Sequence, residues 1–241
     1  MSRDTTKKAG VNREYGKAII QKWTFILIHL IIILFCIWIV YFDGLVHLGE
    51  IFKKNWNLLD PNRAKLLLAC SLLYWLRHIV TLFYLLERKL AWSEVVELVF
   101  FMAFFEIGLL LLGGGAFREY IIQFGWLDVV ASILLVFGAF LNSFSEIQRK
   151  LWKKDTSNKG HCYSKGLFNY SMHINYFGDT IMFTGWCLFT YNFWSLGLPF
   201  LMAIMFIYFH IPGLDVHLYE RYGAEFKAYS ERTKRFIPFL Y

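Results

Sequence analysis

A run of nineteen residues, 24–42, contains no charged side chain. As an α-helix this run would extend roughly 28 Å, close to the ~30 Å hydrocarbon core of a bilayer. A secretory signal has a shorter apolar core that is followed by a small-residue cleavage site, and no such site follows here. The run therefore predicts a retained transmembrane helix.

The rest of the chain repeats this pattern. Hydrophobic residues make up 57% of the sequence and charged residues only 18%, against roughly a quarter in soluble domains. We expect an all-α polytopic membrane bundle of about six spans and a single domain, residues 1–241, divided into a transmembrane scaffold, residues 1–141, and a cofactor-binding and catalytic region, residues 142–241. The further spans expected are 64–86, 95–112, 126–145, about 177–190, and 193–210, the last broken by Pro212 and Gly213 where it leaves the bilayer.

Basic residues indicate the orientation. With six spans, three basic segments fall on one side, which the positive-inside rule makes cytoplasmic together with both termini and a C-terminal helical cap. The net charge of +7 is explained by this orientation and by anionic headgroups, and no nucleic-acid module is visible. The four cysteines lack metal-ligand spacing, so no metal is expected. The three segments hold Arg3, Lys7, Lys8, Arg13, Lys17 and Lys22; Arg149, Lys150, Lys153, Lys154, Lys159 and Lys165; and Arg221, Lys227, Arg232, Lys234 and Arg235.

Ionisable residues lie in the middle of the expected second span, Arg77 and His78, and inside the third, Glu97 and Glu106. Such residues are costly in a membrane and often functional. A structural ion pair of Arg77 with Glu97 or Glu106 is the alternative, and the sequence leaves both interpretations open.

Polar residues gather after residue 141. Asn142, Ser145, Glu146 and Arg149 recur at spacings of three and four, which places them on one helix face. A solvated face would have the same pattern. The segment 166–179 favours a ligand site instead, because amides, tyrosines and an imidazole surround two glycines that allow close backbone contact. Its polar members are Asn169, Tyr170, Ser171, His173, Asn175, Tyr176 and Asp179.

The tail continues the aromatic pattern. Leu218, Tyr222, Phe226 and Tyr229 form one stripe, although Gly223 is expected to divide the helix. A surface helix lying on headgroups is the alternative interpretation.

Several of these blocks, in order, resemble the membrane superfamily that contains steroid 5α-reductases, sterol reductases and isoprenylcysteine carboxyl methyltransferases. The similarity covers about 95 residues. The blocks are Glu-Ile-Gln at 146–148, Asn-Lys-Gly at 158–160, Gly-Leu-Phe-Asn-Tyr at 166–170, His-Ile-Asn-Tyr-Phe-Gly-Asp at 173–179, and Tyr-Gly-x-x-Phe-x-x-Tyr-x-x-Arg-Thr-x-x-Phe-Ile-Pro at 222–238.

The reductase branches read Arg-His-Pro-Asn-Tyr-x-Gly followed by an acid. Here Met172 replaces the Arg and Ile174 the Pro. The resemblance implies an oxidoreductase that uses NADPH on a C=C bond of a lipophilic, steroid-like or enone substrate entering from the membrane. It implies Tyr170, His173 or Tyr176 as the catalytic acid. It implies a cofactor site of Asn142, Glu146, Arg149, Lys159, Asn169, Asn175, Gly178, Asp179, Asp215, Tyr222, Tyr229 and Arg232.

Two alternatives stay open. In the first, the same pocket holds S-adenosylmethionine, with Asp215 and His173 positioning the methyl donor. The methyltransferases have paired acids before the Tyr/Phe-Gly, whereas Leu214 precedes Asp215 here. In the second, the chain is a non-catalytic membrane binding protein, which the substitutions at Met172 and Ile174 motivate. The substrate, the particular membrane and the oligomeric state are not indicated by the residues.

Overall fold

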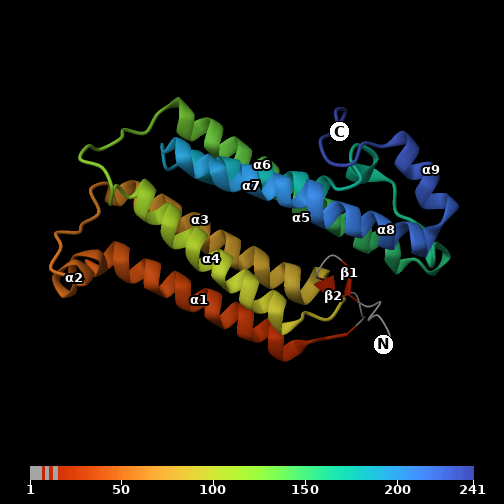
Figure 1. The fold of residues 1–241 in the computed structure, drawn as a ribbon, viewed down its shortest axis with the longest axis horizontal. Helices are drawn as coiled ribbons and strands as arrows, with labels where there is room; N and C mark the ends of the chain where they lie inside the picture. The colour runs from red at the N-terminus through yellow and green to blue at the C-terminus, as the bar shows by residue number, and fades with distance from the viewer. Residues whose placement is uncertain (1–6, 9–10, 13–15) are drawn as a thin grey trace. The chain divides into compact units, whose positions relative to one another are not determined.

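The computed structural model describes residues 7–8, 11–12 and 16–241. Arg3 and Arg13, two of the expected cytoplasmic charges, lie outside the described residues. Helices dominate this part of the chain, as predicted, and β1 (Lys7–Lys8) pairs antiparallel with β2 (Val11–Asn12) (Figure 1). The helices are α1 (Ile19–Tyr41), α2 (Gly44–Ile51), α3 (Pro61–Val80), α4 (Trp92–Gly113), α5 (Trp126–Lys154), α6 (Ile174–Leu188), α7 (Gly197–Met205), α8 (Ile211–Tyr222) and α9 (Ala224–Arg232).

Within the described residues, five helical stretches are long and apolar enough to cross a membrane. The segment expected as a further span forms α6, whose 15 residues give a helix of roughly 22 Å. This length is below the roughly 20 residues that a full crossing needs. The five stretches are Ile19–Tyr41, Pro61–Leu85, Trp92–Gly113, Trp126–Lys154 and Phe193–Tyr222.

The expectation that Pro212 and Gly213 end the last span is wrong. A five-residue π-helical turn, Phe206–His210, precedes α8, and Pro212 lies at the start of that helix. A proline is tolerated in the first helical turn because its missing N–H would have no intrahelical partner there. The helical path therefore continues to Tyr222. Gly223, with φ of +52°, then separates α8 from α9, as predicted.

The chain divides into two compact units. Unit 1 comprises residues 1–13, 132–185 and 197–241, and unit 2 comprises residues 14–131 and 186–196.

Unit 2 is built on α1, α3 and α4. Helix α3 begins where Asp60 accepts a hydrogen bond from the backbone N–H of Arg63 at 3.1 Å, with Pro61 at the first helical position. The apolar core of the three helices includes Ile33 and Cys36 of α1, Leu68 of α3 and Leu110 of α4.

Unit 1 holds α5 and α6 in close contact through two glycines. A Cβ on Gly138 would lie 2.5 Å from the carbonyl oxygen of Gly178, and one on Gly178 would lie 2.6 Å from the backbone nitrogen of Asn142. Only residues without a side chain allow backbones this close. On the other side of α6, the ring of Tyr176 stacks on Phe206 at 4.6 Å between centroids. The N-terminal end of α6 therefore contacts both α5 and the turn before α8.

Candidate functional site

The polar face of α5 contacts the start of α6. The side-chain amide of Asn142 donates to the backbone carbonyl of Asn175 at 3.0 Å, and the amide of Asn175 donates to Glu146 at 3.1 Å. Arg149 forms an ion pair with Glu146 one helical turn away. The polar face predicted for residues 142–149 is therefore a hydrogen-bonded contact between α5 and α6. The carboxylate of Glu146 within it is neutralised by Arg149. Ser145 is buried, and its hydroxyl donates to Asn142 within the same helix.

A second cluster joins His173 to α8 and to the C-terminal segment. The Nε2 atom of His173 lies 2.8 Å from Asp215 Oδ1, and the Nε atom of Arg235 lies 3.2 Å from Asp215 Oδ2. His173 and Asp215 are buried, whereas the side chain of Arg235 is 54% exposed. The imidazole also stacks on Tyr176, with centroids 5.7 Å apart and planes 10° apart. This arrangement fixes the orientation of a buried imidazole between a carboxylate and an aromatic ring.

The C-terminal segment holds this imidazole in place through the backbone. The N–H of Met172 donates to the carbonyl of Lys234 at 2.8 Å, and the N–H of His173 donates to the carbonyl of Arg235 at 3.0 Å. The hydroxyl of Ser171 donates to the carbonyl of Phe236 at 2.8 Å. These bonds tie the C-terminal segment to the residues before α6. They thereby hold Arg235 close to Asp215, the partner of His173.

The aromatic stripe of the tail forms a small apolar core rather than a surface on headgroups. Phe226 and Tyr229 of α9 are buried with Met172 and Cys162, and Leu218 and Tyr222 of α8 pack against them. The hydroxyl of Tyr229 donates to the carbonyl of Phe168 at 2.5 Å. Burial raises the pKa of Tyr229, and it raises the pKa of Cys162 to about 11. Both groups are therefore neutral at physiological pH.

Other predicted site residues lie apart from these clusters. Lys159 and Asn169 are exposed, and the exposed ring of Tyr170 contacts Phe239 at 5.9 Å between centroids. Arg232 is exposed and donates to the hydroxyl of Ser164 at 3.1 Å. The close approach predicted for Gly178 is made to α5, and Asp179 is half-buried one residue further along α6.

The structure thus brings Asn142, Glu146, Arg149 and Asn175 into one cluster and His173, Tyr176 and Asp215 into another. Sequence reasoning missed Arg235 as a member of the second cluster. Its position within the C-terminal motif, three residues after Arg232, was the signal that could have identified it.

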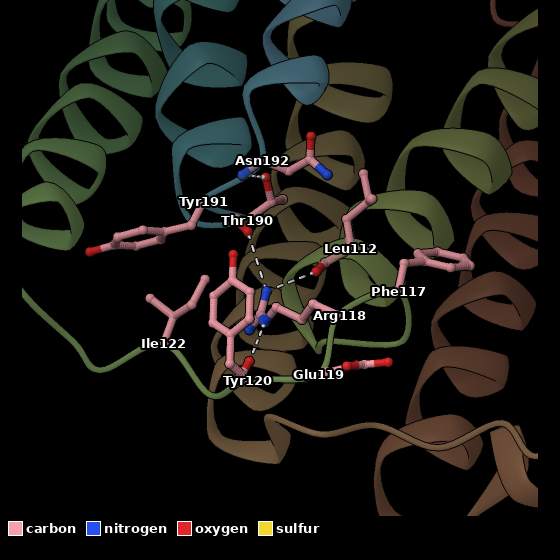
Figure 2. Close-up of a pocket in the computed structure, with 9 residues that line it drawn as sticks. All are labelled: Leu112, Phe117, Arg118, Glu119, Tyr120, Ile122, Thr190, Tyr191 and Asn192. Atoms are coloured by element: carbon pink, nitrogen blue, oxygen red, sulfur yellow. Dashed lines mark hydrogen bonds between the residues drawn. The ribbon is translucent and has the colours of Figure 1, made fainter.

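A separate cavity of about 390 Å³ lies in unit 2, where the segment after α4 meets residues 190–192 (Figure 2). Arg118 lines it, and its five N–H groups all bond to the protein: to the carbonyls of Leu112, Gly113, Tyr120 and Thr190 and to Asp60. No donor of this guanidinium is left for a ligand. Arg118 therefore acts as a cap for the end of α4.

Arg63 forms a second buried ion pair in unit 2. Its side chain is fully buried, lies 2.5 Å from Asp128 and 4.6 Å from the ring centroid of Phe124, and donates to the carbonyl of Phe189. An arginine beside a proposed span would ordinarily be assigned to a solvated loop, so no sequence pattern indicated this burial.

These features define a polytopic membrane helical bundle with a polar cluster in its C-terminal unit. The chain belongs to the family described as "Protein of unknown function (DUF1295)", whose model matches residues 85–233. No curated protein matches the chain.

Proposed function

We propose that the chain is a membrane-embedded, NADPH-dependent reductase of a polarised C=C bond in a lipophilic substrate, steroid-like or another enone. The matched family is grouped with the steroid 5α-reductase-like superfamily, and the match spans α5, α6 and α8 with most of the site residues. The ordered motifs from residue 146 to residue 238 support the same assignment.

The charge balance of the site is the observation that carries the choice of cofactor. Glu146 is paired with Arg149, and Asp215 is paired with both His173 and Arg235. A methyl-donor sulfonium is a cation and is favoured by an unpaired carboxylate, whereas both of these carboxylates already have cationic partners. The surrounding exposed arginines favour a polyanion such as a dinucleotide.

In this proposal the phosphates of NADPH are held by Arg232 and Arg235, whose side chains are exposed. These arginines replace the one that the reductase branches carry at the position of Met172. When bound, NADPH supplies the hydride. The chain's own residues then bind the substrate and supply a proton.

His173 is the proposed proton donor. Asp215 accepts a hydrogen bond from Nε2 of His173 and stabilises the imidazolium. The other ring nitrogen of His173, Nδ1, is then left to protonate the substrate. Tyr176 stacks on this ring and holds its plane, so its role here is positioning. Tyr170 is the weaker candidate for the acid because its exposed ring packs on Phe239.

The cofactor assignment is tested by calorimetric titration of detergent-purified protein with NADPH and, separately, with S-adenosylmethionine. We expect NADPH alone to bind, and Arg235→Gln to weaken its binding about tenfold or more, since a charge-assisted hydrogen bond contributes roughly 1.5–3 kcal/mol. Lys234→Gln, a change at the exposed neighbouring residue, is the matched control and should have a smaller effect. Binding of S-adenosylmethionine without NADPH would contradict the proposal.

The proton-donor role is tested by turnover on a lipid extract with NADPH. His173→Gln should lower kcat by about 10²–10⁴-fold while NADPH still binds, and the exposed Glu231→Gln should change neither property. NADPH binding by the unaltered protein with no turnover on any extract would favour the non-catalytic alternative.

A further inference from the structure

A second set of ionisable groups lies in unit 2 and includes none of the residues of the proposed reaction. It takes one residue from each of three helices: His29 from α1, His78 from α3 and Glu106 from α4. The Nε2 atom of His29 lies 2.7 Å from Glu106 Oε1, and the Nδ1 atom of His29 lies 3.3 Å from the Nδ1 atom of His78. The three side chains form one continuous hydrogen-bonded row.

The row runs from the buried interior to a less buried end. His29 is 0% exposed and Glu106 is 1% exposed, and the second carboxyl oxygen of Glu106 is buried without a hydrogen-bond partner. His78 is half-buried. A carboxylate with an unsatisfied oxygen in such surroundings is costly as an anion. Proton uptake would convert it into a neutral acid.

Few other ionisable groups face this row. On α1, Cys36 is buried near Glu106. On α3, the ring of Tyr74 lies 4.3 Å from that of His78, and the guanidinium of Arg77 lies 5.2 Å from the Tyr74 ring centroid. Glu97, the other acid predicted to lie within this span of α4, is exposed. Phe25 contacts His78 edge-on at 5.1 Å and closes one side.

The donors and acceptors of the row can be arranged in two ways, in which the hydrogen bonds run in opposite directions. Two imidazoles bond through facing Nδ1 atoms only if one carries a proton there and the other does not. With Glu106 ionised, His29 donates from Nε2 to the carboxylate and accepts from His78 at Nδ1. With Glu106 protonated, the acid donates to His29, and His29 donates to His78.

We propose that His78, His29 and Glu106 form an intramembrane proton-binding relay. One proton binds His78 at Nε2, the Nδ1 proton of His78 passes to His29 Nδ1, and the Nε2 proton of His29 passes to Glu106 Oε1. Three bonds to hydrogen form and two break, so one proton is gained and no electron moves. The charge of the row changes from −1 to 0, and both imidazoles end neutral with exchanged tautomers.

The test is ¹⁵N NMR of histidine-labelled protein in lipid nanodiscs across the pH range in which it stays folded, with the two rings assigned from His29→Gln and His78→Gln. On lowering the pH, His29 should change from the Nε2–H to the Nδ1–H tautomer and His78 should make the opposite change in the same step. Glu106→Gln should abolish that step because an amide cannot take up the proton. Glu97→Gln, which alters an exposed acid on the same helix, should leave the step intact.

Two results would overturn the relay: a single tautomer of His29 throughout the folded range, or a joint step that persists in Glu106→Gln. If Glu106→Gln does not fold, His78→Gln replaces it. That variant removes the outer end of the row and should abolish the tautomer change of His29, and persistence of the change there would equally refute the relay.

Discussion

Met172 shows how a single side chain separates this protein from the reductase branches that it resembles. Those branches place an arginine at this position, and here the side chain is 4% exposed among Cys162, Phe226 and Tyr229. A guanidinium in this apolar cluster would lose its hydration, and none of these neighbours is a carboxylate that could pair with it. The packing of α9 over Met172 is therefore matched to an apolar residue.

The substitution Met172→Arg should lower the free energy of unfolding by about 3 kcal/mol or more, because it buries an uncompensated charge. Met172→Leu keeps the volume and the apolar character and should cost less than about 1.5 kcal/mol. Thermal unfolding of both variants in detergent measures the difference. Equal stability of the two variants would show that this position is open to solvent or to a ligand.

Cys162 has a pKa that burial raises from 9.0 to about 11, with a further contribution from the nearby Glu225 carboxylate. The folded state therefore keeps the thiol proton to higher pH than the unfolded state does. The stability that this provides is complete below pH 9 and is lost as the pH rises toward 11.

Alkylation of a variant that retains only Cys162 should reflect this shift. Near neutral pH the folded protein should carry about a hundredfold less thiolate than the denatured protein and react correspondingly slowly. Rates measured with iodoacetamide at several pH values test this expectation. Phe226→Ala, which opens the cover over the thiol, should restore fast labelling, and fast labelling before that change would contradict the burial.

At the scale of elements, the crossing of α5 and α6 determines whether the polar cluster exists. The pairs Gly178–Asn142 and Asn175–Glu146 show that α6 runs antiparallel to α5. The glycine contact allows the amide of Asn142 to reach the carbonyl of Asn175. A small change in helix separation would break both of the hydrogen bonds made by Asn175.

Gly178→Ala should therefore cost about 1–3 kcal/mol of stability, since the new methyl group meets backbone atoms that cannot move aside. It should also weaken NADPH binding. Gly108→Ala in α4 is the matched control, because a Cβ there meets nothing within 4 Å and alanine is the better helix former. Unfolding temperatures and NADPH affinities of the two variants decide the matter. An unchanged Gly178→Ala protein would mean that the helices are further apart.

At the scale of the whole molecule, the sequence predicted which residues share a helix face, but it did not predict which residues of different helices meet. The three- and four-residue spacing correctly grouped Asn142, Glu146 and Arg149, since a helix face follows directly from sequence. Spacing could not show that His29 meets Glu106, 77 residues away, or that Arg235 meets Asp215. Such pairs depend on which helices become neighbours. No local pattern records that choice.

The orientation expected from the basic segments also depends on α6. In the described part of the chain five stretches meet the length of a full span, and five crossings would put the termini on opposite sides. In unit 1, however, α6 runs antiparallel to α5, and the side chain of His173, just before α6, forms a hydrogen bond with Asp215 of α8. The end of α5, the start of α6 and the part of α8 around Asp215 therefore lie at the same height along the helix axes of unit 1. We therefore expect α6 to be a sixth, short crossing, which would put both termini on the side that the positive-inside rule makes cytoplasmic.

Single cysteines in a protein lacking the four native ones test this topology. With an impermeant thiol reagent on intact cells, Glu119→Cys in the connection before α5 should label. Lys17→Cys, Lys159→Cys and Lys234→Cys, all at exposed positions, should label only after permeabilisation if α6 crosses, because the positive-inside rule then predicts that all three are cytoplasmic. Labelling of Lys17→Cys and Lys234→Cys from opposite sides would mean that α6 does not cross.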